Sequence, residues 1–510
     1  MLFTTAPFLL LFLPLTLAGF FAIGRHSRSG AAAWLLLMSL FFYAWWMPVF
    51  VALLMASIIV NFAIGLRISK AVAAAGVAAG VLSGTAAAAQ PDRAAAKRWL
   101  AAGVVANLGL LAYFKYANFF VGNLNQMLGT QWHIGHVILP IGISFYSFTQ
   151  IAYLVDTYRA KVHEAKPIHY GLFVTYFPHL IAGPVLHHAQ MMPQFGNAAI
   201  YRFNGANFAA GLAIFAIGLA KKVVLADGVS PYADAVFGPV DQGQSPGLQE
   251  AWLATLAYTF QLYFDFSGYS DMAIGLSWMF NIRLPFNFDS PYRATSISDF
   301  WRRWHISLSN FLRDYLYVAL GGNRRGSVRR YINLAATMLL GGLWHGASWS
   351  FVLWGGLHGL YLMLNHAFRA LCGAARCQRL DNSRLFSVFG WGLTMLAAML
   401  AWVFFRAETL AGALRLVGAM APGAGAPGVN ALLWNAGLQP STGWLWCLCL
   451  GALAFLAPNS NHIGGRLRSR VEASALARGI VGGMAGAAAL LLLVVNTARD
   501  SVSAFIYFNF

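Results

Sequence analysis

Apolar runs of about 20 residues recur along the whole chain and alternate with short clusters of basic residues. A helix of this length can cross the hydrocarbon core of a bilayer. In the first third of the chain, such runs occupy roughly residues 1–24, 31–46, 49–66, 99–121 and 137–158. Later runs occupy roughly residues 207–226, 386–405, 442–457 and 480–497. The pattern predicts an all-α polytopic membrane protein.

Two segments depart from this pattern. Residues 173–188 carry two prolines inside an apolar run, which indicates a re-entrant or broken helix, because non-helical backbone at membrane depth must be buried in protein or line water. Residues 71–98 begin with an Ala/Gly-rich stretch that basic residues flank on both sides. We expect a cytosolic loop or a surface helix there.

The composition supports a membrane protein. Of the 510 residues, 59% are hydrophobic and only 10% are charged, whereas soluble domains carry about 25% charged residues. The apolar runs extend from end to end, so we expect residues 1–510 to form a single membrane-embedded domain.

The formal net charge of +18 does not indicate nucleic-acid binding. Lys and Arg lie in short clusters between the apolar runs, as the positive-inside rule predicts. No basic patch with base-stacking aromatic residues lies outside those runs, so we expect no nucleic acid as a partner.

The basic clusters also predict the topology. Arg25 and Arg28 follow the first run, and Arg67 and Lys70 follow the third. These ends should share the cytoplasmic face. The N-terminus and the tail at residues 498–510 are then both expected outside.

Several kinds of site find no support in the sequence. The cysteines at 372 and 377 and at 447 and 449 have neither a CxxC motif nor a histidine at ligand spacing beside them, so no metal site is predicted. No P-loop, GxSxG, HExxH or dinucleotide-binding fingerprint occurs.

Two histidines stand out in the segment 299–359, which we expect to be the catalytic core. His305 follows Trp304 and His345 follows Trp344, both within largely apolar sequence. An ionisable group in such surroundings is costly and therefore indicates a functional site. His305 falls on an aromatic stripe of a helix predicted to start at Ser296 and to continue past residue 312. A histidine that only packs in the core remains the alternative there.

His345 lies in the run LGGLWHGAS, whose glycines allow close helix approach. No acidic residue occurs from Ser327 through Leu380, so no local triad forms. A neutral imidazole can still act as a general base on a hydroxyl group, and Gly346 should leave one side of the ring open to a substrate. The alternative is a histidine that hydrogen-bonds across the bundle.

Other charged residues have structural and functional interpretations. Asp265 and Asp271 are expected to be counter-charges for arginines, which could be Arg283, Arg293, Arg302 or Arg303. The basic cluster containing Arg324 and Arg325 could contact phosphates of a cytosolic donor. Positive-inside anchoring explains that cluster equally well.

Three stretches carry a family resemblance: YFDFSGYSDMAIG, SPYRATSISDFWRRWHISLSNFLRDYLYVALGGNRRG and MLLGGLWHGASWSFVLWGGLHG. Together with FPHLIAGPV and GLAKKVVLAD, they resemble the membrane-bound O-acyltransferase (MBOAT) family, and the bacterial alginate O-acetyltransferase branch in particular. The resemblance implies an MBOAT-type ring of about 10–13 transmembrane helices, with re-entrant segments and a central tunnel. It also implies that His345 is the catalytic histidine and that His305 lines the same tunnel.

The resemblance implies an O-acyltransferase of the bacterial inner membrane. The donor would be cytosolic acetyl-CoA, with no permanently bound cofactor. From their charge, Arg303, Arg324 and Arg325 are the candidate residues for contacting the donor. The acceptor would be an exported polysaccharide, reached through a periplasmic SGNH-like acyltransferase partner. Acylation of a lipid or a protein is an alternative. A proton-coupled transporter is a further alternative, but such proteins usually show paired halves, and none are evident.

The tail contains the aromatic sequence FIYFNF. Aromatic clusters of this kind anchor proteins at membrane surfaces. The sequence also resembles a C-terminal motif of related acyl-export systems, which would make Tyr507 a covalent acyl carrier. Both interpretations of Tyr507 remain open at this point.

Overall fold

The structure, a computed structural model, describes residues 1–81, 90–135, 137–162, 166–181, 183–373, 378, 380, 382–423, 430–499 and 503–506. These residues form helices and connecting segments, with no strand among them. They divide into two compact units. Unit 1 comprises Met1–Ala216, Met272–Pro285 and Leu467–Asp500, and unit 2 comprises Ile217–Asp271, Phe286–Arg466 and Ser501–Phe510. A single membrane-embedded domain stays a prediction.

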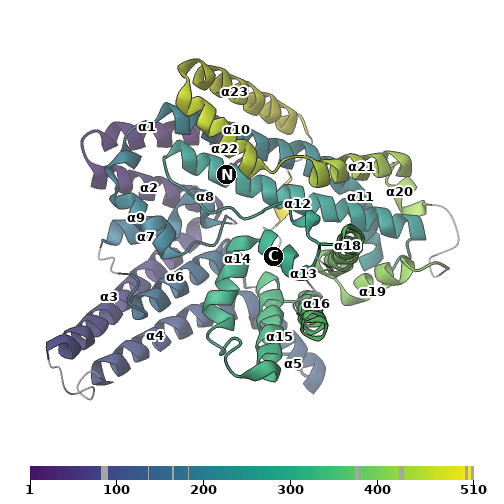
Figure 1. Cartoon of the computed structure of the whole chain (residues 1–510), viewed down its shortest axis with the longest axis horizontal. Coiled ribbons are helices and arrows are strands. Elements are labelled where there is room, and N and C mark those ends of the chain that lie inside the picture. The colour runs from purple at the N-terminus through teal and green to yellow at the C-terminus, as the bar shows by residue number, and fades with distance from the viewer. Residues whose placement is uncertain are drawn as a thin grey trace. The chain divides into compact units, whose positions relative to one another are not determined.

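The helices that lie wholly in unit 1 come mainly from the first 200 residues (Figure 1). They are η1 (Pro7–Phe12), α1 (Leu13–Gly24), α2 (Arg28–Trp46), η2 (Pro48–Phe50), α3 (Val51–Val81), α4 (Gln90–Leu111), η3 (Ala112–Tyr116), α5 (Ala117–Leu128), α6 (Ile143–Tyr158), α7 (Pro167–Thr175), α8 (Phe177–Leu180), α9 (His188–Gly196), η4 (Ala198–Tyr201) and α23 (Ala475–Thr497).

Unit 2 contains the segment expected to be catalytic. Its helices are η5 (Lys221–Ala226), α11 (Asp227–Asp241), η6 (Pro291–Arg293), α13 (Ile297–Arg303), α14 (Ile306–Phe311), η7 (Leu312–Tyr317), α15 (Gly326–His345), α16 (Trp349–Cys372), α18 (Arg384–Arg406), α19 (Leu410–Ala419), α20 (Ala431–Asn435) and α21 (Pro440–Leu456). Three helices contribute residues to both units: α10 (Gly205–Ala220), α12 (Leu248–Met279) and α22 (Ser460–Ala473).

The long apolar helices confirm the prediction of an all-α, multi-pass membrane protein. Within the described residues, seven helical stretches are long and apolar enough to cross a membrane, and α21 with α22 forms a further pair bent by 57°. The run expected at 207–226 is longer than predicted. It continues through η5 and α11 as one stretch, Gly205–Asp241, because Lys221 and Lys222 find buried carboxylate partners instead of ending the helix.

The predictions for the two irregular segments compare differently with the structure. The chain between residues 173 and 188 is broken as predicted: α7 ends at Thr175, Tyr176 leaves the helical conformation, and the short α8 follows. In the 71–98 segment, α3 continues to Val81 and α4 begins at Gln90, so the described parts are helical, and residues 82–89 lie outside the described ranges.

The single helix predicted from Ser296 onward is wrong beyond its first two turns. Its start is confirmed, because the Ser296 hydroxyl accepts a hydrogen bond from the Asp299 N–H at 3.2 Å. However, α13 ends at Arg303, and His305 has a left-handed backbone with φ +43° before α14 begins. Hydrophobic periodicity cannot reveal a single residue in this conformation, because the side chains on either side still follow a helical spacing.

Candidate active site

His345 is the last residue of α15, and α16 begins shortly after it at Trp349. Gly342 on α15 and Gly355 on α16 lie against each other, and a Cβ atom at Gly342 would lie 3.0 Å from the Gly355 Cα atom. The predicted close approach of glycine-bearing helices is therefore confirmed at this pair. It fixes the end of α15, and with it the imidazole of His345.

Aromatic rings surround the His345 imidazole, which is 4% exposed. The ring centroids of Trp344, Trp354 and Phe405 lie 4.9, 5.0 and 5.1 Å from its own. The expectation that Gly346 leaves one side of the imidazole open is wrong. A Cβ atom at Gly346 would overlap the ring of Phe351, so the space beside this glycine is filled by packing.

His305 lies in the break between α13 and α14 and is 1% exposed. Its Nδ1 atom lies 3.2 Å from the Oδ1 atom of Asn287. The ring of Phe266 contacts the imidazole edge-on, with centroids 4.7 Å apart. A left-handed conformation at a non-glycine residue costs about 1–3 kcal/mol and tends to occur where function requires it.

Asn287 is the residue that holds this strained turn. Its Oδ1 atom also accepts hydrogen bonds from the Ser307 N–H at 3.2 Å and the Ser307 hydroxyl at 2.8 Å. Its backbone carbonyl accepts a bond from the Ile306 N–H at 3.0 Å. Sequence analysis missed Asn287, because an asparagine in an irregular segment carries no periodic signal and its partners lie about twenty residues away.

The two predicted histidines belong to one aromatic cluster in unit 2. The ring of Trp344 lies 4.9 Å from that of His345 and 6.5 Å from that of His305. The structure therefore brings together the two imidazoles that the sequence singled out, with a tryptophan between them.

A third histidine, His358 on α16, is also part of this cluster. It is fully buried, its ring lies 4.9 Å from that of Trp354, and its Nδ1 atom accepts a hydrogen bond from the Trp301 indole at 3.3 Å. Sequence analysis did not single it out. The bond to Trp301 gives His358 a clear packing role between α13 and α16.

A buried ionic cluster around Lys222 includes Asp265, which is next to Phe266 on α12. The Lys222 Nζ atom lies 2.7 Å from Asp227 Oδ1 and 2.8 Å from Asp265 Oδ1. Asp271 pairs with Lys221 at 2.6 Å. Asp265 and Asp271 are thus counter-charges, as expected, but their partners are these lysines and not the arginines that the sequence suggested.

The Lys222 cluster also binds residues 503–506. Lys222 donates hydrogen bonds to the Ser503 hydroxyl at 3.0 Å and the Ala504 carbonyl at 3.1 Å. The Ile506 N–H donates to Asp265 Oδ2 at 2.9 Å. Sequence analysis gave no indication of this contact between segments far apart in the chain.

Phe505 is buried in the same region. Its ring stacks on that of Tyr269 with centroids 4.4 Å apart and lies 5.7 Å from that of Phe266. Phe505 is therefore packed in the interior of unit 2, so the interpretation of the aromatic tail as an interfacial anchor does not hold for this residue. Tyr507, the predicted acyl carrier, lies outside the described residues.

The three arginines predicted to contact the donor differ in their surroundings. The Arg303 Nε atom lies 3.0 Å from both carboxylate oxygens of Asp299, so its charge is already balanced. Arg324 and Arg325 lie exposed in the segment before α15. Among the described residues, no group of three or more His, Cys, Asp or Glu side chains could hold a metal ion.

Comparison with known proteins relates this chain to a family. The sequence profile of MBOAT, the membrane-bound O-acyltransferase family, matches residues 27–405, which include the ionic cluster and all three histidines. The chain is 42% identical over 447 residues to the peptidoglycan O-acetyltransferase of Helicobacter pylori, covering 82% of this chain and 80% of that protein.

Two further relatives have related activities. The probable alginate O-acetylase AlgI of Pseudomonas aeruginosa is 44% identical over 425 residues, which cover 82% of this chain and 75% of that protein. The teichoic acid D-alanyltransferase of Bacillus subtilis is 24% identical over 241 residues, covering 46% of this chain and 60% of that protein. The chain belongs to the membrane-bound O-acyltransferase family.

Proposed function

We propose that this acyltransferase moves an acetyl group from cytosolic acetyl-CoA across the membrane for O-acetylation of an exported polysaccharide. The main support is the arrangement in unit 2, where His345 and His305 share one aromatic cluster and Asn287 orients His305. The names of the relatives, which include O-acetyltransferases of alginate and peptidoglycan, support the class of acceptor.

In the proposed reaction, His345 accepts the proton of the attacking hydroxyl group as a general base. The hydroxyl oxygen forms a bond to the acetyl carbonyl carbon, and the carbon–sulfur bond of the thioester breaks. The leaving thiolate takes up the proton from His345, so CoA is released as a thiol. His305 would polarise or position the thioester carbonyl, since an imidazole N–H can stabilise the charge that develops on that oxygen.

The attacking hydroxyl is proposed to be that of Tyr507. Support comes from the four residues before it, which the Lys222 cluster and the rings of Tyr269 and Phe266 hold inside unit 2. Phe266 contacts both Phe505 and His305. A phenol with a pKa of about 10 leaves more readily than a sugar alkoxide, so a tyrosine ester could pass the acetyl group on.

The partner and the membrane are part of the same proposal. The acceptor of the tyrosine ester would be a periplasmic SGNH-like acyltransferase, which would acetylate the polysaccharide. The protein would lie in the bacterial inner membrane with both termini periplasmic. In unit 1, the Asn496 side chain donates a hydrogen bond to the Thr4 carbonyl at 2.9 Å, which supports the same side of the membrane for the N-terminus and the end of α23.

Phosphate groups of the donor are proposed to contact Arg324 and Arg325. Both guanidinium groups are exposed, and arginine pairs with phosphate in a bidentate manner. Arg303 was expected to contribute as well, but its pairing with Asp299 makes it the least available of the three.

The test combines kinetics with mass spectrometry of the purified protein in detergent. His345→Ala should lower turnover of acetyl-CoA by about 10²–10⁴-fold, and His305→Ala should be damaging but less severe. The C-terminal peptide of the wild-type protein should gain the mass of an acetyl group after incubation with acetyl-CoA.

His358→Phe is the matched control, because it replaces another buried histidine of the same cluster. It should keep acetyl transfer within a few-fold of wild type. Near-normal turnover in His345→Ala would refute the general base. An unmodified Tyr507 together with full activity in Tyr507→Phe would refute the relay and leave direct transfer from CoA to the final acceptor.

A further inference from the structure

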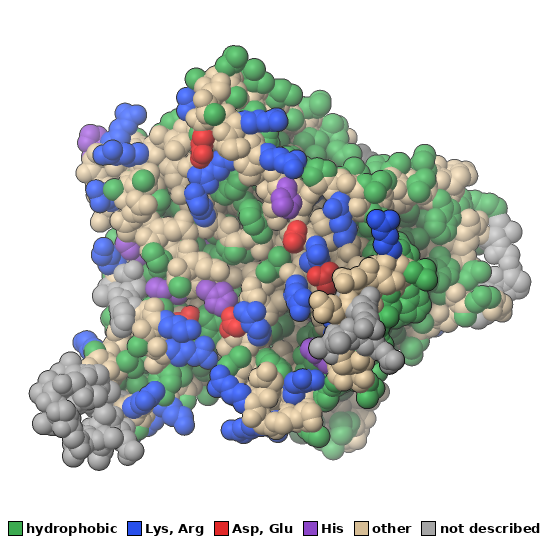
Figure 2. Space-filling view, in the orientation of Figure 1, with side chains coloured by type: hydrophobic (Ala, Val, Ile, Leu, Met, Phe, Trp, Pro, Cys, Tyr) green, Lys and Arg blue, Asp and Glu red, His purple; other side chains and the backbone are tan. Residues whose placement is uncertain are grey.

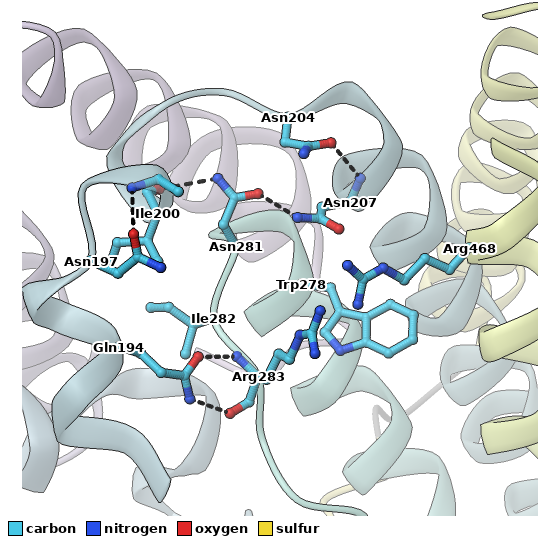
Figure 3. Close-up of a pocket in the computed structure, with 11 residues that line it drawn as sticks. Gln194, Asn197, Ile200, Asn204, Asn207, Trp278, Asn281, Ile282, Arg283 and Arg468 are labelled. Atoms are coloured by element: carbon cyan, nitrogen blue, oxygen red, sulfur yellow. Dashed lines mark hydrogen bonds between the residues drawn. The ribbon is translucent and has the colours of Figure 1, made fainter. Parts of the chain in front are cut away.

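A polar pocket with a volume of about 230 Å³ lies in unit 1, outside the histidine cluster. Residues of α9, of η4, of the start of α10, of the end of α12 and of α22 line it. We call it the arginine pocket. The argument below uses the lining residues Gln194, Asn207, Trp278, Asn281, Arg283 and Arg468 (Figure 3).

The amide side chains of the arginine pocket hold its walls in place. Gln194 pairs with both backbone groups of Arg283: its Oε1 atom accepts the N–H at 2.8 Å, and its Nε2 atom donates to the carbonyl at 2.9 Å. Asn281, with φ +60°, donates to the Arg202 carbonyl at 2.8 Å and accepts from Asn207 at 2.9 Å. The hydrogen bonds of these amide side chains therefore fix the shape of the pocket.

Two guanidinium groups converge in this preorganised space. Figure 3 shows the side chains of Arg283 and Arg468 directed toward the same side of the pocket, beside Trp278. The Arg468 Cζ atom lies 5.9 Å from the Trp278 ring centroid. Two like charges at one place repel each other, and a bound anion would relieve that repulsion.

The acidic groups near the pocket balance only one of these charges. Arg468 pairs with Glu472 at 2.9 Å. The Arg283 guanidinium makes no ion pair or side-chain hydrogen bond with the residues that the structure describes. None of the pocket-lining residues is acidic. Arg283 therefore has its donors available for a ligand.

A second pocket that also borders η4 extends this positive region within unit 1. It is lined by Arg25, His26, Arg28 and Arg202 and likewise has no acidic lining residue. On the face seen in Figure 2, blue basic side chains clearly outnumber red acidic ones. A surface region whose charges share one sign raises the local concentration of ligands that carry the opposite charge.

We propose that the arginine pocket is a binding site for a phosphate group, carried as a monoester or a diester. Guanidinium groups match the geometry of phosphate oxygens. The volume exceeds that of a phosphate and leaves room for a directly attached polar group, as a bound water takes only about 30 Å³. Positive-inside anchoring explains basic residues on this face, but not their convergence in one shaped pocket.

The phosphate could belong to the headgroup of an anionic phospholipid or to the nucleotide part of a soluble donor. The proposal does not depend on the acetyl-transfer function, because no residue of the pocket belongs to unit 2. The two sources can be separated by experiment.

The experiment is calorimetric titration of the delipidated protein in neutral detergent with two probes. Short-chain phosphatidylglycerol represents the lipid, and adenosine 3′,5′-bisphosphate represents the nucleotide. Dihexanoylglycerol and adenosine, which lack phosphate, are the matched ligand controls. At least one phosphate-bearing probe should bind, and its affinity should fall by about tenfold or more in R283Q and in R468Q, because charge-assisted hydrogen bonds are lost.

R478Q is the matched protein control, because Arg478 is an exposed arginine of unit 1 outside both pockets. It should bind the probe like wild type. Binding of only the lipid probe or only the nucleotide probe would identify the source. The proposal is overturned if neither probe binds, if R478Q weakens binding as much as R283Q does, or if both pocket variants, folded by size-exclusion chromatography, bind with unchanged affinity.

Discussion

Replacement of Lys222 by methionine should strongly destabilise unit 2 and release residues 503–506. The side chains of Lys222, Asp227 and Asp265 are 6%, 7% and 2% exposed. Removing one partner of a buried ion pair costs about 3–5 kcal/mol, because the remaining charge is left unpaired. In Lys222→Met, two carboxylates lose their common partner, so we expect a cost in this range.

Lys222→Met should also loosen the packing of residues 503–506. Lys222→Met removes the donor to Ser503 and Ala504, while the bond from Ile506 to Asp265 remains. Hydrogen exchange followed by mass spectrometry should therefore show faster exchange in the C-terminal peptide. Lys221→Met is the matched control, because its buried partner Asp271 makes no hydrogen bond to the described residues 503–506. It should destabilise the protein without faster exchange in that peptide.

A double variant tests the electrostatic origin of the effect. In Lys222→Met with Asp265→Asn, one unpaired charge is gone, and the amide oxygen can still accept the Ile506 N–H. The apparent melting temperature should then lie above that of Lys222→Met. Equal melting temperatures for wild type and Lys222→Met, or equally fast exchange of the C-terminal peptide in both, would refute the reasoning.

Three further predictions concern unit 2. Asn287→Leu should remove the acceptor used by the Ser307 N–H and hydroxyl and destabilise the protein by about 1–3 kcal/mol, measured by thermal unfolding. Asn287→Asp, which keeps an acceptor, should lose less stability. Gly342→Leu should separate α15 from α16 and abolish activity through misfolding, which a loss of the monodisperse peak in size-exclusion chromatography would reveal. Arg324→Ala with Arg325→Ala should raise the KM for acetyl-CoA with little change in kcat; an unchanged KM would return both residues to an anchoring role.

The sequence predicted those features that depend on neighbours along the chain. The apolar runs become long helices, Ser296 begins α13, and glycines bring α15 and α16 together at His345. Each depends on spacing or on a local hydrogen bond. The helical stripe through His305 shows the limit of such reasoning, because one residue in a left-handed conformation interrupts the helix without changing the pattern of apolar side chains.

Contacts between distant segments could not be predicted in the same way. Sequence analysis recognised Asp265 as a carboxylate in need of a counter-charge, but several cations were available, and only the folded chain selects Lys222. The role of Asn287 was missed for the same reason. Its importance comes from three hydrogen bonds to a turn that the sequence did not reveal.

The burial of residues 503–506 has a consequence for biosynthesis. These residues follow every other element of unit 2 in the chain, yet Phe505 is only 2% exposed within it. The ribosome must therefore synthesise the chain through residue 506 before this interior can close. Until then, Lys222 and Asp265 lack part of their hydrogen-bonding environment. A prematurely terminated chain would leave these buried polar groups exposed, and membrane quality-control proteases could recognise them.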